Sequence, residues 1–412
     1  MKFLGVTPVF LSVTALFFAW GFITSNNDPL IAALIASFRL SYTEALMIHL
    51  VSFAAFGLVS MPAAALLSRV GAHRSIMIAL LMMVGGCLLV QLVTRFERFE
   101  LILTALFILA AGITVLQVAA NPLAAALGPI ERSHFRLTLA QAFNSLGVVI
   151  GTTFGSVVML GDLASTAPQV APDDPAQRLL VLRGVAHAFL VMAVFLSLLV
   201  VAVWVSRRSL QGKELVAEGG GGSPLAALRS AWAVAGAVAI GLYVGAEVSI
   251  SSVLINFLSQ PNILDIPLET AGFYLANLYW MGALVGRFVG SILLTRVSAA
   301  WLLLFTAVVA GLLCLIGAVT AGPVAAFATL AVGLFNSIMF PTIFSITLER
   351  SSAPRSSTSG LLCLAIAGGA IIPYAVGMIA DHATLSAALF VPMAAYGAIA
   401  VFAASARKRA AA

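Results

Sequence analysis

The pentapeptide Leu66-Leu67-Ser68-Arg69-Val70 has a near copy in the second half of the chain, Leu293-Leu294-Thr295-Arg296-Val297. Each copy ends a long apolar run, with an arginine between a small hydroxyl residue and a valine. A motif repeated in this way predicts two similar halves in which the copies end corresponding helices. Further outward, on the preceding helix of each half, Asp28 and Glu247 correspond if the second half has the longer outer loop, and residues 259–269 provide that length.

The amino-acid composition indicates that these halves fold in a membrane. Of 412 residues, 62% are hydrophobic and 9% are charged, with a mean hydropathy of +1.11, whereas about a quarter of a soluble domain is charged. A membrane-spanning helix needs roughly 20 apolar residues. The apolar runs predict an all-α membrane protein of twelve spans, at residues 8–30, 44–68, 75–94, 100–128, 137–160, 183–206, 228–258, 270–295, 299–320, 323–348, 358–380 and 384–406.

The longest inward loop divides these spans six and six. We expect an N-terminal six-helix half at 1–206, a cytoplasmic linker at 207–227 and a C-terminal six-helix half at 228–412, related by pseudo-symmetry. The run Gly219–Ser223 suits a flexible connection.

Basic residues are concentrated on one side of the predicted spans. That side holds most of the 21 lysines and arginines: Lys2, Arg69, Arg74, Arg132, Arg136, Arg207, Arg208, Lys213, Arg229, Arg296, Arg350, Arg355, Arg407, Lys408 and Arg409. Because basic loops remain in the cytoplasm, we expect a multi-pass protein of the bacterial inner (plasma) membrane with both termini cytoplasmic. The bilayer also accounts for the sequence pI of about 9.6, and no nucleic-acid partner is expected.

Three charged residues lie inside predicted spans: Asp28, Glu247 and Arg287. A charge at mid-bilayer costs roughly 2.5–3.5 kcal/mol on the mildest scale, so each needs a partner, a wet cavity or a neutral state. Asp28 is either a solvated residue at the end of its helix or a buried carboxylate that loads and releases a proton. Glu247 is either tied to neighbouring hydroxyls or ionic in function, and Arg287 could snorkel to the cytoplasm or take part in function.

Neutral polar residues recur at helical spacing on several spans. They are Gln117 and Asn121 on the fourth, Gln141, Asn144 and Ser145 on the fifth, Asn277 and Trp280 on the eighth, and Asn336 before Pro341 on the tenth. Any one of them could simply bond to a neighbouring helix. Together they predict a cavity of amides and aromatics suited to a neutral polyhydroxyl ligand. Gly147, Gly151 and Gly155 require no ligand, because glycines four apart allow close helix packing.

Several classes of protein are excluded. The chain has no phosphate-binding GxxxxGK[ST] loop, hydrolase triad or metal-ligand cluster, so we expect no enzyme, no ATP-driven pump, no cofactor and no metal. Cys87, Cys314 and Cys363 lie inside apolar runs and are expected to be packing residues.

The polar motifs resemble those of the fucose–galactose–glucose:proton symporters of the major facilitator superfamily, and most of all their glucose/galactose branch. The matching stretches are Trp20-Gly21-Phe22 with Asn27-Asp28, Gly112 to Pro122, Leu139 to Gly147, Tyr243 to Ser249, Leu278-Tyr279-Trp280 with Gly286-Arg287-Phe288, and Phe335 to Thr342. They run in order through all twelve spans.

The resemblance implies the major facilitator fold and uptake of a hexose with a proton. It implies that Asp28 carries the proton and that Gln117 and Gln141 contact sugar. Two positions depart from the wider family: Gln117 replaces the glutamate of the fucose branch, and Leu123 stands where an aromatic residue often follows Asn-Pro.

These observations predict a monomeric transporter with alternating access that imports a glucose- or galactose-like sugar by proton symport. We expect Asp28 and Glu247 to couple the proton, and the substrate to contact Asn27, Gln117, Asn121, Gln141, Asn144, Asn277, Trp280 and Asn336. The alternatives are a proton-coupled exporter of drugs or metabolites, and a sugar-sensing receptor. An exporter would carry a glycine-proline signature late in the fifth span, but Gly155 is followed by Ser156. A receptor would carry a signalling domain, for which no loop is long enough.

Overall fold

A computed structural model describes residues 8–27, 29–30, 34, 42–96, 98–166, 175–205 and 224–408, and this part of the chain contains helices and no strands. Asp28 lies outside the described residues. So does the predicted linker, apart from the short 3₁₀ helix η3, Pro224–Arg229.

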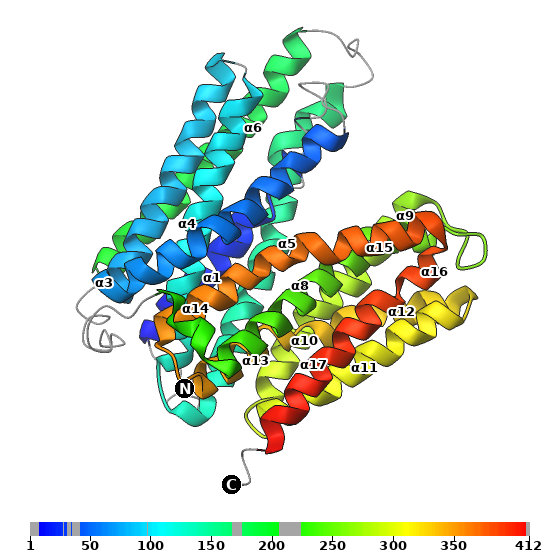
Figure 1. Cartoon of the computed structure of the whole chain (residues 1–412). Coiled ribbons are helices and arrows are strands. Elements are labelled where there is room, and N and C mark those ends of the chain that lie inside the picture. Colours follow the sequence, from blue (N-terminus) through cyan, green and yellow to red (C-terminus); the bar gives the residue numbers. More distant parts are fainter. Residues whose placement is uncertain are drawn as a thin grey trace. The chain divides into compact units, whose positions relative to one another are not determined.

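Among the described residues, the first part of the chain contains five long helices (Figure 1). They are α1 (Pro8–Thr24), α3 (Tyr42–Phe96), α4 (Phe99–Ala126), α5 (Ser133–Thr166) and α6 (Pro175–Val205), with the 3₁₀ turn η2 (Ile130–Arg132) before α5. The helix α3 contains two predicted spans. At Gly71 its backbone leaves the helical region (φ 81°, ψ 170°), a conformation that favours glycine.

The second part of the chain has more breaks. Its elements are α8 (Ala231–Leu258), α9 (Leu268–Tyr274), the π-helix η4 (Leu275–Trp280), α10 (Met281–Leu293), α11 (Ala299–Val319), α12 (Gly322–Asn336), α13 (Met339–Arg350), α14 (Arg355–Ala365), η5 (Ile366–Ala370), α15 (Ile371–His382), α16 (Leu385–Ala388) and α17 (Phe390–Lys408). The eighth, tenth, eleventh and twelfth predicted spans are therefore each interrupted helices.

Among the described residues, nine helical stretches are long and apolar enough to cross a membrane, and a shorter one covers Phe10–Thr24. The stretch Leu50–Leu92 counts as two spans because of the break at Gly71, and α9, η4 and α10 together supply the remaining one. The predicted twelve-span, all-α membrane fold is confirmed.

The chain forms two compact units. One comprises Met1–Leu127 and Phe143–Gly222, and the other comprises Gly128–Ala142 and Ser223–Ala412. The start of α5 thus packs within the second unit, although the chain on both sides of it belongs to the first.

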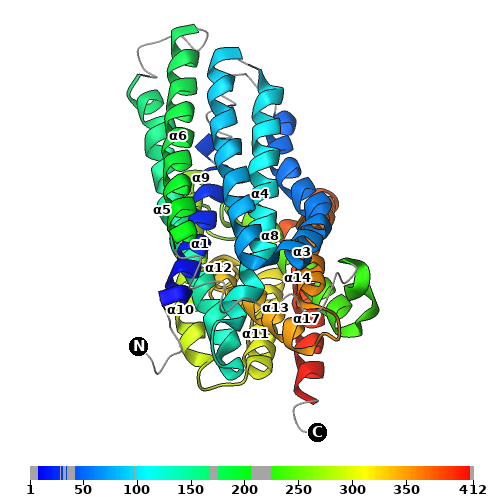
Figure 2. The ribbon, with the colours of Figure 1, turned by 90° about the vertical axis from the view of Figure 1, so that its left-hand side faces the viewer.

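Close helix packing organises the first unit. A Cβ at Gly147 of α5 would overlap the carbonyl oxygen of Phe18, and a Cβ at Gly21 of α1 would overlap that of Asn144. The backbones of α1 and α5 therefore nearly touch, as the glycine spacing predicted. Elsewhere in this unit α3 and α4 lie side by side along much of their length (Figure 2).

The helix α4 is the central helix of its unit. From Leu109 to Ala124 every residue is buried, so this segment is enclosed on all faces, as is expected of a helix that is apolar all round. The polar residues among these are held inside protein rather than facing lipid.

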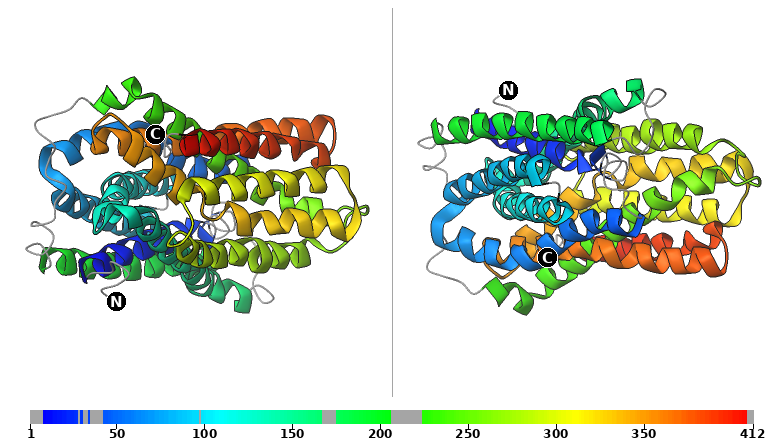
Figure 3. Two further views of the ribbon diagram at one scale, coloured as in Figure 1. Left: turned by 90° about the horizontal axis from the view of Figure 1, so that it is seen from below. Right: turned by 90° about the horizontal axis from the view of Figure 1, so that it is seen from above.

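In the second unit, α11, α12 and α17 run alongside one another (Figure 3). The α12–α13 break follows from Pro341, which lacks the N–H that would bond to the carbonyl of Ser337. Arg287 of α10 replaces it: its Nε donates to the Ser337 carbonyl oxygen at 3.0 Å. One role of Arg287 is therefore to stabilise a broken helix.

The glycine contacts allow a direct test of packing in the first unit. We expect Gly147→Ala to lower the free energy of unfolding by about 1–3 kcal/mol, since α1 must move to admit a methyl group. Gly85→Ala is the matched control, because nothing lies within 4 Å of a Cβ there. Thermal unfolding of the two purified variants in detergent measures the difference, and equal stabilities would contradict the close approach.

Candidate functional site

The helix break after α1 is enclosed by protein. Ser25 and Asn26 form a turn, are 8% and 1% exposed, and donate from their side chains to the Phe22 carbonyl oxygen at 3.1 and 2.6 Å. The amide oxygen of Asn26 is buried without a hydrogen-bond partner among the described residues and lies against Gly155 of α5. Asn27 is half-buried. The backbone beside Asp28 is thus in a buried, polar setting.

Two amides lie on the enclosed segment of α4. Gln117 is 2% exposed and Asn121 is fully buried. The side-chain oxygen of Gln117 has no hydrogen-bond partner among the described residues. A buried acceptor left unpaired costs about 1–3 kcal/mol, so this oxygen is suited to accept a hydrogen bond from a ligand hydroxyl or from water.

The two predicted residues of α5 fall in different units. Gln141 is 4% exposed and belongs to the second unit, whereas Asn144 is 8% exposed and belongs to the first. Asn144 Nδ2 donates to the Phe17 carbonyl oxygen at 3.0 Å. This bond joins α5 to α1, so at least one of its amide groups serves helix packing.

Glu247 lies on α8 in the second unit. It is half-buried, and the hydroxyl of Tyr243, one turn earlier, donates to its Oε1 at 2.7 Å. Arg287 interacts with it electrostatically. Tyr243 is therefore a neighbouring hydroxyl that bonds this acid within its own helix.

Asn336 joins two further tyrosines to this carboxylate residue. Its Nδ2 donates to the hydroxyl of Tyr279 at 3.1 Å and to that of Tyr396 at 3.3 Å, while the Tyr279 hydroxyl lies 3.5 Å from the Glu247 carbonyl oxygen. Both tyrosines are fully buried. A polar network therefore runs from α8 through η4 to α12 and α17. Among the described residues, the side-chain oxygen Oδ1 of Asn336 has no hydrogen-bond partner.

The π-helix η4 positions the remaining predicted residues. Trp280 is 39% exposed and packs edge-on against Tyr279, with ring centroids 5.2 Å apart. Asn277 is exposed and donates to the Phe273 carbonyl oxygen of its own helix at 3.0 Å. Single π-helical turns are rare and frequent at functional sites. This one buries Tyr279 while leaving its neighbour Trp280 at the surface.

Sequence reasoning missed the three tyrosines as polar components. Tyr243 carried a signal, since it stands four residues before Glu247 and so shares its face. Nothing in the sequence marked Tyr279 and Tyr396 as polar components, because their role depends on which helices pack together.

Each unit therefore presents amide groups and aromatic rings on helices that are otherwise apolar. Amides donate and accept at once, which matches the hydroxyl groups of a carbohydrate. The two acids identified by sequence belong to different units by position, Asp28 within Met1–Leu127 and Glu247 within Ser223–Ala412.

Comparison with known proteins assigns this arrangement to a family. Residues 9–373 match the Major Facilitator Superfamily. The chain belongs to the major facilitator superfamily. The predicted transporter class, as opposed to an enzyme, is confirmed by this membership.

Within the superfamily, the chain is 41% identical over 396 residues to the "Glucose/galactose transporter" of Brucella abortus, covering 95% of this chain and 92% of that protein. It is 30% identical over 411 residues to the "L-fucose-proton symporter" of Escherichia coli, covering 96% and 92%. The structure matches the crystal structure of FucP, a major facilitator superfamily transporter, in the outward conformation. The TM-score is 0.87 and the identity 26%, over 98% of this chain and 99% of that one. The resemblance to the fucose–galactose–glucose:proton symporter family is confirmed.

The buried network of this transporter can be tested with a pair of asparagines. Asn336→Ala removes the donor shared by two buried tyrosine hydroxyls, so we expect the free energy of unfolding to fall by about 1–3 kcal/mol. Asn277→Ala removes only an exposed bond within one helix and should change it by less than about 0.5 kcal/mol. Thermal unfolding without sugar measures both, and an equal loss in the two variants would contradict the network.

Proposed function

We propose that this transporter imports a monosaccharide, glucose or galactose, in symport with a proton by alternating access. The relatives named above are a glucose/galactose transporter and an L-fucose-proton symporter, and they match the chain over nearly its whole length. The observation that carries the sugar assignment is the pair of buried amide oxygens, on Gln117 and Asn336, without partners among the described residues.

A neutral polyhydroxyl ligand suits these groups better than an ion or an apolar drug. Hydroxyl groups would supply the hydrogens that Gln117 and Asn336 accept, and aromatic rings such as that of Trp280 would cover the apolar C–H faces of the ring. We assign the sugar contacts to Asn27, Gln117, Asn121, Gln141, Asn144, Asn277, Trp280 and Asn336. The bond from Asn144 to Phe17 leaves its amide oxygen for this role.

We assign proton coupling to Asp28 and Glu247, one acid in each unit. Symport needs a group that binds a proton on one side and releases it on the other, and a carboxylate does so because burial favours its neutral form and a wet cavity its charged one. The Tyr243 hydroxyl donates to Glu247 and holds this acid in place. Asp28, beside the buried turn at Asn26, is therefore the stronger candidate for the moving proton.

The domain boundaries and setting complete the proposal. We propose six-helix halves at 1–206 and 228–412 joined by a cytoplasmic linker at 207–227, in a monomer in the bacterial inner membrane with both termini cytoplasmic. The concentration of basic residues on one side of the spans supports this orientation. The start of α5, which packs with the second unit, then lies at the cytoplasmic end of its helix.

Sugar binding tests the role of Gln117. We expect Gln117→Ala, and independently Gln141→Ala, to weaken binding of the transported sugar at least tenfold, about 1.4 kcal/mol. Counterflow of labelled glucose and galactose in proteoliposomes identifies the sugar, and titration calorimetry measures its affinity. Unchanged affinity in both variants would remove these residues from the site, and counterflow of neither sugar would favour another substrate or an exporter.

Coupling is tested at Asp28. Asp28→Asn mimics the protonated acid permanently, so the variant should still bind sugar and perform counterflow but should fail to accumulate sugar in response to a pH gradient. Glu247→Gln, which preserves shape and removes the charge, is measured beside it in the same proteoliposomes. Uphill accumulation by Asp28→Asn would contradict the assignment and make Glu247 the coupling group.

A further inference from the structure

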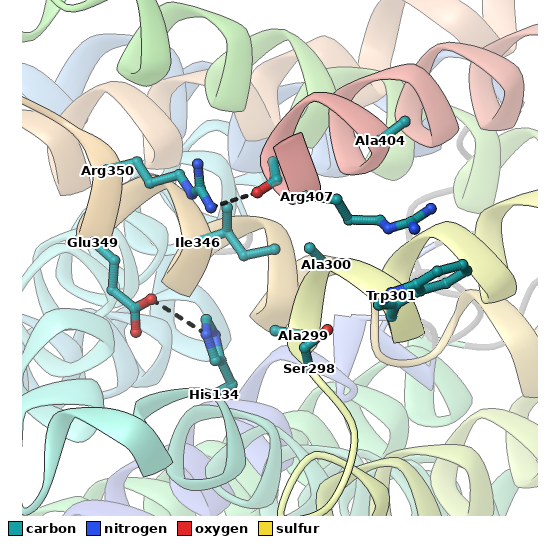
Figure 4. Close-up of a pocket in the computed structure, with 11 residues that line it drawn as sticks. His134, Ser298, Ala299, Ala300, Trp301, Ile346, Glu349, Arg350, Ala404 and Arg407 are labelled. Atoms are coloured by element: carbon teal, nitrogen blue, oxygen red, sulfur yellow. Dashed lines mark hydrogen bonds and ion pairs between the residues drawn. The ribbon is translucent and has the colours of Figure 1, made fainter. Parts of the chain in front are cut away.

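His134, in the first turn of α5, contacts α13 through both of its ring nitrogens. Its Nε2 lies 3.3 Å from Oε2 of Glu349, and its Nδ1 lies 2.6 Å from the hydroxyl of Ser345 (Figure 4 draws the first contact). The preceding residue, Ser133, donates to the other carboxylate oxygen of Glu349. Three side-chain contacts thus join two successive residues of α5 to one face of α13.

Both protonation states of His134 satisfy these contacts, and they differ in charge. A carboxylate only accepts, so the contact with Glu349 places a hydrogen on Nε2. The Ser345 hydroxyl has one hydrogen, which it gives either to the Pro341 carbonyl oxygen at 2.6 Å or to Nδ1 of a neutral ring. A protonated ring donates through both nitrogens and adds a positive charge opposite the Glu349 carboxylate.

Several charged groups surround this pair. Glu349 faces the guanidinium groups of Arg136 and Arg350 electrostatically. Arg407 lines the same cavity of about 520 Å³ as His134 and Glu349. Its guanidinium carbon lies over the ring of Trp301, 3.2 Å from the ring centroid. The charged groups on η2, at the start of α5, at the end of α13 and at the end of α17 are Glu131, Arg132, Arg136, Glu349, Arg350, Arg407 and Lys408.

The segment that carries His134 is a compact piece attached to the second unit. Residues Gly128–Ala142 pack there, although the chain before and after them belongs to the first unit. Arg136, wholly buried, donates to the carbonyl oxygens of Pro129 and Gly128 at 2.8 and 3.4 Å and so maintains the shape of the segment. Alternating access moves the two repeats of such a transporter against each other, so the contacts of this segment with α13 resist any motion that carries α5 away from α13.

We propose that His134 is a proton-binding site, separate from the coupling acids, whose protonation holds the start of α5 on α13 and makes transport depend on cytoplasmic pH. Loss of the proton removes the positive charge opposite the Glu349 carboxylate and weakens the attachment. A low cytoplasmic pH then slows the transport cycle, which would otherwise bring more protons into the cytoplasm. This inference rests on the proposed function and orientation.

Hydrogen exchange of the purified, full-length transporter tests the site without sugar. Imidazoles titrate between about pH 5 and pH 8. After correction for intrinsic rates, we expect amides in Gly128–Ala142 to exchange roughly tenfold faster at about pH 8 than at about pH 6, the effect of losing one charge-assisted hydrogen bond. His134→Gln and Glu349→Gln should exchange quickly at both values, while His134→Arg, a permanent cation with several donors, should exchange slowly at both.

His187→Gln is the matched control, because His187 is exposed on α6 in the first unit. It should behave as the wild type does. Wild-type exchange that does not change with pH, or a pH response that persists in His134→Arg, would overturn the proposal. Should His134→Gln or Glu349→Gln fail to fold, the comparison of wild type with His134→Arg still decides it.

Counterflow at equal pH on the two sides adds a functional measurement. The ratio of rates at about pH 8 and about pH 6 should be at least threefold lower in His134→Arg than in His187→Gln, since an imidazole is the group that titrates in this interval. Equal ratios would overturn the link to transport. Absence of sugar counterflow in every variant, with the exchange pattern intact, would count against the proposed function and leave the proton site supported.

Discussion

A backbone carbonyl that loses its helical donor inside a membrane must find another, and the bond from Arg287 to Ser337 meets that requirement where α12 ends. Pro341 has no N–H to donate to the Ser337 carbonyl oxygen, and Arg287 on α10 donates to that oxygen instead. The break in turn leaves Asn336 at the C-terminal end of α12, within reach of Tyr279 and Tyr396. The polar network of the second unit therefore depends on an arginine whose charge would otherwise be costly at this depth.

The first unit meets the same requirement in another way. At the turn after α1, Ser25 and Asn26 donate to a carbonyl of their own helix, and the near contact of α1 with α5 encloses them. Glycine makes this enclosure possible, because a side chain at Gly147 would hold the helices apart. The close packing of α1 against α5 thus encloses the polar turn. Asp28 follows this turn in the sequence.

Proton chemistry in this transporter need not be confined to the coupling acids. His134 contacts Ser345 and Glu349 through its two ring nitrogens, at a segment that belongs to one unit while its flanking chain belongs to the other. A transporter that carries protons inward benefits from a sensor on the side where they are released. The sensor and the coupling acids would respond to pH in different ways. Protonation of the sensor would hold the start of α5 in place, whereas the coupling acids would bind and release a proton as sugar is transported.

The amino-acid sequence by itself determined the membrane environment, the twelve spans, the glycine contacts and the acids and amides inside the bilayer, because each depends on composition or on spacing along one helix. Only the tertiary structure decided that Glu247 bonds to Tyr243, that Asn336 joins two buried tyrosines, and that Arg287 caps Ser337, since such pairings depend on which helices meet and at what depth. The π-helix η4 was equally beyond prediction, because one extra residue in a helical turn leaves no mark on an apolar run. The attachment of the start of α5 to the second unit also depends on the tertiary structure, because side-chain contacts rather than chain continuity decide where a helix end is held.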